Sequence, residues 1–480
     1  MTNRDSLSHV IDQIILRCES FARASMESRD LFELRNNPRK NQGDQSDSEV
    51  HLYSQERFEI PCTHPVEFTF KDWQHYLGER NTLYFRNNER TYIGLSPEQC
   101  PALSKSQAIA ALENSFTLFK LNPFDAINES NHVWSQWNLL GNLLPPLLIS
   151  YEHGSSAITI QLTKLDSDEK EPLLKLAANW KKLSRPSPQE NQRNSLSVKK
   201  VEENPNFKDW NFYMEKLLAD LENNPDQVTK MVAAREVIVE LEESSEAYNL
   251  FNSLSSHSQY SFFLRNESLY FMGNTPECLL KHRDHEFEFD ALAGTRARGK
   301  SDAEDLALER ELWESPKEQF EHLQVVDYLK EGLREYGEVT AGESHILKLK
   351  SLQHIKTPLL LKSKSKANQI GQSETLFELF EKLHPTPAVC GLPKEYAKKF
   401  ILHHEPINRG LYAGAFGVIE RNQSDLCVTI RSLLFSSSQK RVHLYGGAGI
   451  VKGSTAKGEW LETAEKMKSF SPLDINIDIN

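Results

Sequence analysis

The chain lacks the features that mark secreted and membrane-spanning proteins. None of its six cysteines forms a CxxC pair with another, which argues against a disulfide framework and against a zinc ribbon. The first residues include no continuous apolar segment of the kind found in a secretory signal. The longest apolar stretch, LLGNLLPPLLI, is too short to cross a bilayer and is interrupted by two prolines. We therefore expect a reduced, soluble, cytoplasmic protein without a membrane partner.

An excess of positive charge is also missing. The formal net charge is -12 over 480 residues, so a broad basic surface for nucleic acid is not expected. A small anionic ligand would need local cations or a metal ion to offset this charge. With 39% hydrophobic and 26% charged residues, the composition is that of a globular protein. The sequence has no internal repeat, and a monomer and a dimer are both compatible with it.

No nucleotide-binding motif accounts for the glycine-rich segment near the end of the chain, AGIVKGSTAKGEWLETAEK. A P-loop requires Gly-Lys before Ser or Thr, whereas the order here is Lys452, Gly453, Ser454. Gly447, Gly449 and Gly453 give GxGxxxG, which is one residue longer than the dinucleotide fingerprint. We interpret the glycines either as a tight turn or as residues that bring backbone N–H groups close to a ligand.

Polar segments without periodicity predict two loops, at residues 35–49 and 184–206. The second loop divides the chain into an N-terminal supporting part, residues 1–205, and a catalytic part, residues 206–471. The order of elements in the second part, strands in runs, then helices, then strands, predicts an α+β fold with antiparallel sheets. The predicted elements are a helix over 211–223, a strand over 230–243, two strands within 260–273, and strands over 287–294, 426–435 and 441–447.

The helix predicted over residues 313–333 has a well-defined start. Ser315 is the expected N-cap, Pro316 occupies the first helical position, and Glu318 completes a capping box. Glu321 lies outside the apolar stripe of this helix, so it is either a solvated surface charge or a ligand that points into a cleft. The stripe itself consists of Leu323, Val326, Leu329 and Leu333.

Glu459, Glu462 and Lys466 recur at helical spacings of three and four. Such a pattern usually marks a solvated face with an i,i+4 Glu–Lys pair. The same carboxylates also suit a divalent cation, since Mg²⁺ commonly uses one or two protein carboxylates and keeps positions for water and substrate.

Two basic residues lie within apolar strand patterns, Lys230 and Arg431. Charge on an edge strand protects it from unwanted pairing. Alternatively, an arginine can clamp a carboxylate, and a buried lysine can serve as a base. Glu277 closes FMGNTPE just after a strand, where a carboxyl group borne by a loop can act as a general acid. We expect structural roles for His322 and His384.

Eight segments occur in an order that resembles the chorismate-utilising enzymes, with the closest fit to isochorismate synthases of menaquinone and siderophore pathways. The resemblance extends over residues 206–470. The segments are KMVAAREV, FMGNTPECLL, ALAGTRARG, SPKEQFEHLQVVDYL, LHPTPAVCGLPK, NRGLYAGAFG, CVTIRS and YGGAGIVKGSTAKGEWLETAEK.

The resemblance implies a large α/β sandwich, with two extended antiparallel sheets flanked by helices and the active site in the cleft between them. It also implies a role for each matching residue. Lys230 matches the general base that acts on water, and Glu277 matches the general acid. Glu321 and Glu462 match the Mg²⁺ ligands, with Glu459 adjacent through a metal-bound water. The contacts to substrate carboxylates are matched by Arg431, Gly447 and Lys466, and the loop under the ring and the metal is matched by Gly294 and Thr295.

The implied reaction is the Mg²⁺-dependent conversion of chorismate to isochorismate, in which water adds at C2 and the C4 hydroxyl leaves. Salicylate synthases share this catalytic set and also eliminate pyruvate, so they are the nearest alternative, and a non-catalytic chorismate-binding relative is another. Ala293 stands where enzymes that make aminodeoxychorismate carry a lysine nucleophile, which disfavours that activity. The LLES element of many anthranilate synthases is absent.

Overall fold

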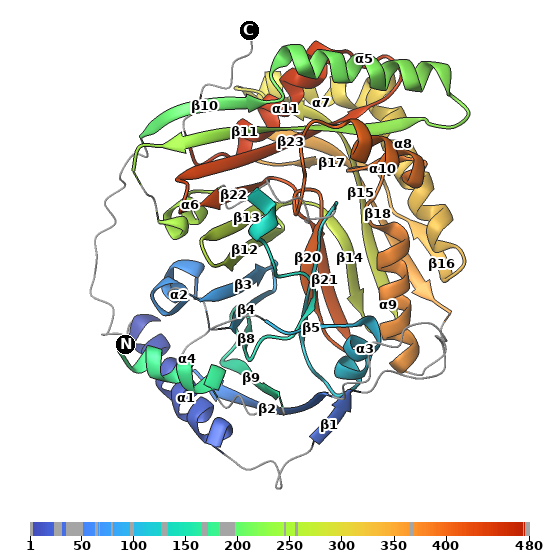
Figure 1. The fold of residues 1–480 in the computed structure, drawn as a ribbon. Helices are drawn as coiled ribbons and strands as arrows, with labels where there is room; N and C mark the ends of the chain where they lie inside the picture. Colours follow the sequence, from blue (N-terminus) through green and yellow to red (C-terminus); the bar gives the residue numbers. More distant parts are fainter. Residues whose placement is uncertain are drawn as a thin grey trace.

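Two large antiparallel sheets form the fold, with helices packed against them (Figure 1). The computed structural model describes residues 3–23, 31–34, 51–62, 66, 68–77, 80–96, 100–125, 133–165, 171–182, 197–243, 246–254, 258–364, 369–473 and 475. Thirteen of the described strands belong to the first sheet and ten to the second. All their pairings are antiparallel, which confirms the predicted fold class.

The first sheet begins and ends on different parts of the chain. Its order is β1 (Leu31–Leu34), β2 (His51–Pro61), β9 (Ala157–Leu165), β8 (Leu147–Glu152), β4 (Arg90–Ser96), β3 (Asn81–Arg86), β12 (Tyr260–Asn266), β13 (Leu269–Thr275), β22 (Ser432–Ser436), β23 (Arg441–Ile450), β11 (Lys230–Leu241) and β10 (Val198–Asn204), with β19 (Gly391–Leu392) paired to the start of β11.

The second sheet likewise combines early and late strands. Its order is β16 (Gly337–Ala341), β18 (Leu352–Ser363), β15 (Glu286–Ala297), β14 (Cys278–Arg283), β21 (Gln423–Val428), β20 (Ala415–Ile419), β6 (Leu118–Asn122), β7 (Gly141–Leu143) and β5 (Ala102–Leu103), with β17 (His345–Lys348) beside β18. Strands from both sides of the predicted boundary at residue 205 therefore share each sheet, and that boundary stays a prediction.

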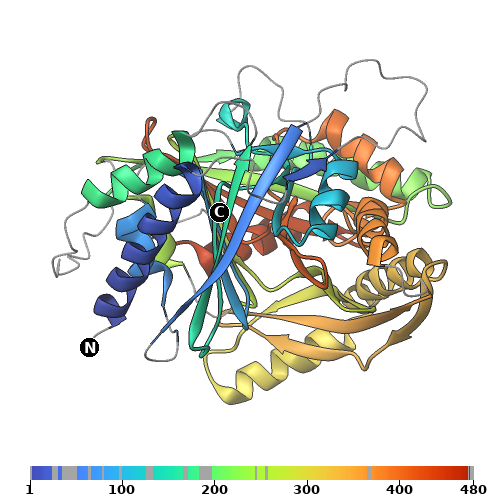
Figure 2. The ribbon, with the colours of Figure 1, turned by 90° about the horizontal axis from the view of Figure 1, so that it is seen from below.

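The helices are α1 (Asn3–Arg23), α2 (Phe70–Leu77), α3 (Lys105–Glu113), α4 (Glu171–Lys182), α5 (Phe207–Asn223), α6 (Ala247–Ser253), α7 (Asp302–Glu314), α8 (Pro316–Leu333), α9 (Gln369–Leu383), α10 (Lys394–His404) and α11 (Ala456–Phe470), with a 3₁₀ turn at Val133–Gln136. Figure 2 shows α1 and α4 side by side on the outer side of the first sheet, away from the orange strands of the second. No helix within the described ranges is long and apolar enough to cross a membrane.

Side-chain alternation along the first sheet creates two hydrophobic cores. In β3, Leu83 and Phe85 join the core that lies between the sheets, whereas Tyr84 joins the core under α1, α2 and α4. Both faces of the sheet are therefore buried, which explains why β3 and β11 are buried almost without interruption rather than alternately.

Most of the predicted elements are confirmed, including the helix at α5 and the strands at β11, β12, β13, β15 and β23. The loop predicted at 184–206 is wrong at its end, because β10 pairs with β11 there. The loop predicted at 35–49 lies outside the described residues. The single strand predicted over 426–435 is two strands, since β21 belongs to the second sheet and β22 to the first.

The helix at α8 begins as predicted, with the Ser315 side chain accepting from the Glu318 N–H at 3.4 Å. Two details of the prediction are wrong. The Glu318 side chain does not return to the N-cap, because it accepts from the Thr295 N–H and pairs with Arg296. Leu323 is 52% exposed and is replaced in the buried stripe by Val325. The buried face consequently includes Glu321.

Candidate active site

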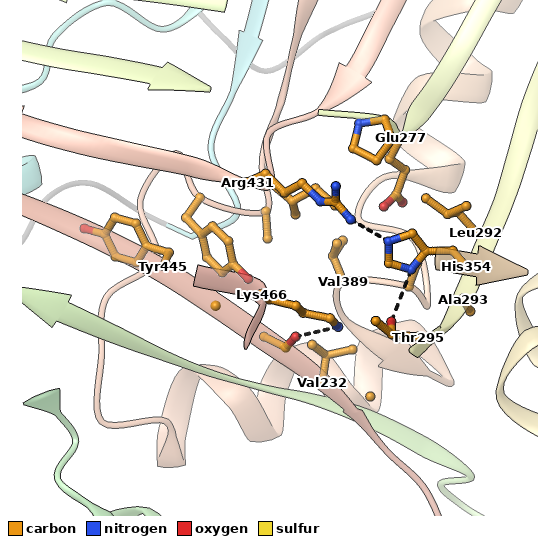
Figure 3. Close-up of a pocket in the computed structure, with 18 of the residues that line it drawn as sticks. Val232, Glu277, Leu292, Ala293, Thr295, His354, Val389, Arg431, Tyr445 and Lys466 are labelled. Atoms are coloured by element: carbon orange, nitrogen blue, oxygen red, sulfur yellow. Dashed lines mark hydrogen bonds between the residues drawn. The ribbon is translucent and has the colours of Figure 1, made fainter. Parts of the chain in front are cut away.

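A pocket lies between the two sheets, where α8 and α11 also reach it (Figure 3). Seven of the residues predicted for the site line it: Glu277, Gly294, Thr295, Glu321, Arg431, Gly447 and Lys466. The other three, Lys230, Glu459 and Glu462, pair with lysines or carboxylates beside it. The structure therefore gathers at one place residues that are up to 236 positions apart, from Lys230 to Lys466.

Lys230, the first residue of β11, forms an ion pair with Glu321 of α8. The Lys230 side chain is fully buried, and its Nζ lies 3.0 Å from Glu321 Oε1. Burial raises the pKa of Glu321, but the ammonium groups of Lys230 and Lys466 outweigh burial and leave the pKa below its usual value. Glu321 is consequently an anion in the folded protein, and the interpretation of it as a solvated surface charge is wrong.

Gly447, Gly449 and Gly453 do not share one role, and the interpretation that such glycines bring backbone N–H groups close to a ligand stays a prediction for the pocket-lining Gly447. Gly447 and Gly449 lie within β23, paired with Ala234 and Val232, and only Gly453 occupies a turn, with φ +93°. A Cβ at Gly449 would overlap Glu321 Oε1 and lie 2.7 Å from its Cδ. Gly449 is therefore required to admit a carboxylate side chain, and the backbone-turn interpretation applies to Gly453 alone.

Glu277 precedes β14 and is 4% exposed. Burial raises its pKa to about 8, against the opposing effect of the Lys230 charge. The carboxyl group therefore holds its proton at neutral pH, and Figure 3 shows it directed toward Arg431 and His354. A buried acid that is protonated at pH 7 is suited to proton donation.

Arg431 occupies the break between β21 and β22, where its backbone has φ +49°. The prediction that Arg431 lies within a strand is therefore wrong, because it lies where the chain passes from one sheet to the other. Its guanidinium contacts Nε2 of His354 on β18. Burial lowers the pKa of Arg431 to about 10, so the group remains charged at neutral pH.

His354 is a site residue that the sequence analysis missed. Its Nδ1 lies 3.1 Å from the Gly294 carbonyl and 3.2 Å from Thr295 Oγ1. Burial lowers the pKa of His354 well below its usual value, and the Arg431 charge adds to this effect. The neutral ring can thus donate from Nδ1 to Gly294 and accept from Arg431. A histidine within the apolar segment LQHIKTPLLL was the available signal, the same one that singled out Lys230.

Tyr412 was also missed. It lines the pocket, and its ring stacks on Tyr445 with centroids 5.2 Å apart. Burial raises the pKa of Tyr412 to about 12, so the hydroxyl keeps its proton and can donate to an anionic ligand. Nothing in its local sequence distinguishes this tyrosine from a core residue.

Lys466 enters the pocket from α11. Its Nζ donates to the Gly447 carbonyl at 2.9 Å and pairs with Glu462 Oε1 at 2.8 Å. Burial lowers the pKa of Lys466, but Glu462 and Glu321 together raise it above its usual value. The predicted i,i+4 pair is confirmed, and it lies at the pocket instead of on a solvated face.

Four carboxylates from two helices surround this end of the pocket, each with its own cation. Lys230 pairs with Glu321, Lys466 with Glu462, Lys317 with Glu459 at 2.7 Å, and Arg296 with Glu318 at 2.9 Å. In the described part of the chain no three acids converge into a ready-made metal site.

The acids nevertheless suit Mg²⁺ chemically, because carboxylate oxygens are its preferred protein ligands. Glu459 Oε2 is buried without a hydrogen-bond partner among the described residues. Burial and the Glu462 charge raise the pKa of Glu459 to about 7, which reflects carboxylates held close together. Glu321, Glu459 and Glu462 therefore fit a divalent cation, with Glu318 beside them as an acid that the sequence analysis did not assign.

Comparison with known proteins identifies the family. Residues 101–472 match the family model described as chorismate binding enzyme. The chain belongs to this family. It is 31% identical to the chloroplastic isochorismate synthase of Catharanthus roseus over 356 residues. The matched region covers 71% of this chain and 60% of that protein. The match thus spans less than two thirds of that relative's length.

Two further similarities delimit the family. The solved structure of MenF, the menaquinone-specific isochorismate synthase of Escherichia coli, has a TM-score of 0.70 and 25% identity, covering 86% of this chain and 92% of MenF. Anthranilate synthase component 1 of Saccharolobus solfataricus is 34% identical over 218 residues, 44% of this chain and 50% of that protein. Relatives with different reactions therefore share this fold.

Proposed function

We propose that the chain is an isochorismate synthase, an isomerase that converts chorismate to isochorismate with Mg²⁺. The observation that carries the proposal is a pair of buried groups suited to opposite proton transfers at one pocket. Glu277 holds a proton at neutral pH, and Lys230 is a buried amine beside the pocket-lining Glu321. Exchange of a hydroxyl between two ring carbons requires an acid and a base.

Chorismate is a dianion that enters a chain of net charge -12, so the pocket must supply positive charge locally. Arg431 and Lys466 provide two cations, and Tyr412 provides a neutral donor. Mg²⁺ held by Glu321 and Glu462, with Glu459 nearby, would neutralise a substrate carboxylate and fix its orientation. Gly294, Thr295 and Gly447 leave room for the ring and the carboxylates near the backbone.

In the proposed reaction, the Lys230 ammonium that pairs with Glu321 first gives up a proton to solvent, and the resulting amine takes a proton from water while the water oxygen bonds to ring C2. The double bond shifts, the bond from C4 to its hydroxyl breaks, and Glu277 gives its proton to the departing oxygen. Water is thus consumed and released once in each turnover. Glu277 is reprotonated and Lys230 deprotonated by solvent before the next one.

Product analysis tests the proposal. Purified protein is incubated with chorismate and Mg²⁺, the products are separated by liquid chromatography, and pyruvate is measured with lactate dehydrogenase. We expect isochorismate without pyruvate. Salicylate with an equal amount of pyruvate would identify a salicylate synthase instead, anthranilate in the presence of ammonia would identify an anthranilate synthase, and unchanged chorismate would identify a non-catalytic relative.

A further inference from the structure

Arg235 lies on β11, five residues beyond Lys230, and is not among the residues that line the pocket. It is fully buried, and among the described residues its charge pairs with one carboxylate, Glu203 on β10, at 3.4 Å. Burial lowers the pKa of Arg235 to about 10, so it stays charged at neutral pH. Burial of a charged group destabilises the folded state unless hydrogen bonds and ion pairs offset the lost hydration. Arg235 takes part in none of the steps of the proposed reaction.

The other polar and ring contacts of the Arg235 side chain within the described residues are with α11. Its Nε donates to Thr463 Oγ1 at 2.8 Å, and its Nη2 donates to the Trp460 carbonyl at 3.5 Å. Its guanidinium carbon lies 3.5 Å from the centroid of the Trp460 ring, which is close stacking of a cation on an aromatic face. The Arg235 side chain thus contacts two residues of α11, Trp460 and Thr463, which are three positions apart.

These two positions directly follow the acids of the pocket. Trp460 follows Glu459, and Thr463 follows Glu462. Successive residues of an α-helix are about 100° apart around its axis, so fixing Trp460 and Thr463 fixes the direction of the residues before them. A rotation of the helix by a fraction of a turn would move both carboxylates away from α8.

Several other contacts also hold α11: the Trp460 ring packs against Phe207 and Trp210, and Lys466 donates to the Gly447 carbonyl at 2.9 Å. The Trp210 indole donates to the Ala456 carbonyl at 2.9 Å, at the first residue of the helix. A Cβ at Gly446 would lie 2.9 Å from the Thr463 carbonyl oxygen, which shows how closely the helix approaches β23. Arg235 differs from these contacts in that it engages both residues that directly follow the two acids, Trp460 and Thr463.

We infer that Arg235 is a positioning residue that helps to set the rotation of α11 and so to aim Glu459 and Glu462 at a divalent cation. The inference rests on the proposed function, because it concerns the Mg²⁺ that this function requires. Arg235 touches neither substrate nor metal ligand, and it acts through Trp460 and Thr463. Residues that orient metal ligands typically contribute about 10- to 100-fold to metal affinity.

The test measures Mg²⁺ binding itself by titration calorimetry, with and without chorismate. Arg235→Met removes the charge and the hydrogen bonds at similar length, and Thr463→Val removes the oxygen that accepts from Arg235 and that itself donates to the Trp460 carbonyl at 2.8 Å. Arg80→Met is the matched control, since Arg80 is a buried arginine bound to the carbonyls of Tyr76 and Leu77, with no contact to α11.

We expect the Mg²⁺ Kd to rise about tenfold in Arg235→Met and by a smaller factor in Thr463→Val, with Arg80→Met unchanged. Wild-type Kd in both α11-directed variants would overturn the inference, and Thr463→Val alone decides if Arg235→Met does not fold. An equal rise in Arg80→Met would also overturn it, because general destabilisation would then explain the effect. Product analysis separates this from the proposed function: a wild type that binds Mg²⁺ but forms no isochorismate refutes the function alone, and one that binds no Mg²⁺ refutes both.

Discussion

The Glu321 carboxylate occupies the space that a side chain at Gly449 would fill. Gly449 lies in β23 and Glu321 in α8, so the absence of one methyl group lets an acid from the second sheet's helix reach the strand that neighbours Lys230. This relationship leads to a direct prediction about activity.

Gly449→Ala should displace Glu321 from Lys230 and reduce kcat by at least about tenfold, because a misplaced carboxylate can neither pair with Lys230 nor bind Mg²⁺. Gly332→Ala in α8 is the control, since its new methyl meets the ends of two flexible side chains, Leu383 at 3.1 Å and Lys382 at 3.9 Å. Kinetics with chorismate measure both variants. Full activity of Gly449→Ala would show that the position of Glu321 does not matter.

The pH dependence of the reaction should report Glu277. Its folded-state pKa of about 8 is raised above the ordinary 4.5 by burial, so the acid is lost as pH rises through about 8. We expect kcat to fall above that pH. Glu277→Gln should reduce kcat by about 10²- to 10⁴-fold and remove this alkaline limb from any residual activity. If the fall in kcat above pH 8 persists in Glu277→Gln, that fall is due to the ionisation of another group.

The same shift makes a prediction about stability. The folded protein retains the Glu277 proton at pH values where the unfolded chain has lost it, so stability must fall as pH rises from about 4.5 through about 8. Glu277→Gln cannot ionise and should lose this part of the decline. Denaturant unfolding of both proteins at pH 6 and pH 9 measures the difference, and parallel declines would contradict the assignment.

Mg²⁺ removal should abolish turnover, and added Mg²⁺ should restore it. Glu321→Gln and Glu462→Gln keep the side-chain shape but remove a charge, so each should greatly reduce activity with the fold intact. Circular dichroism checks the fold, and calorimetry checks Mg²⁺ binding. Undiminished turnover in EDTA, or normal Mg²⁺ binding by both variants, would remove these acids from the mechanism.

The residue pattern predicted antiparallel strands well because β-branched and other apolar residues dominate them, as in the EVIVEL end of β11, whereas the arrangement in two sheets came from the family resemblance. It failed where a local pattern continues across a change of sheet. CVTIRSLLF looks like one strand, and nothing in its residues reveals that Thr429 to Arg431 cross between sheets. Arg431 owes its position to that crossing.

Site residues were predictable where a charge interrupts an apolar pattern, as at Lys230, and where a resemblance supplied the role. Tyr412 and Glu318 were not, because a tyrosine in a core and a glutamate near a helix start are ordinary. The role of Gly449 also could not be read, since it depends on a side chain from a helix more than a hundred residues earlier, a contact that only the folded chain creates.

Lys230 provides the sharpest test among the variants. Lys230→Ala should lose about 10²- to 10⁴-fold in kcat while chorismate Kd changes little, because Arg431 and Lys466 still hold the carboxylates. Lys230→Arg should be nearly as poor, since a guanidinium stays charged and cannot take a proton. Near-full kcat in Lys230→Arg would make Lys230 a binding cation and require a base elsewhere.

The central claim is that water adds to chorismate at one ring carbon while a hydroxyl leaves another. Turnover in ¹⁸O-labelled water, followed by mass spectrometry and NMR of the product, tests it most directly. The account predicts isochorismate that carries the heavy isotope in its C2 hydroxyl. Isochorismate with unlabelled oxygen at C2 would contradict water addition, and a different product would contradict the assigned reaction.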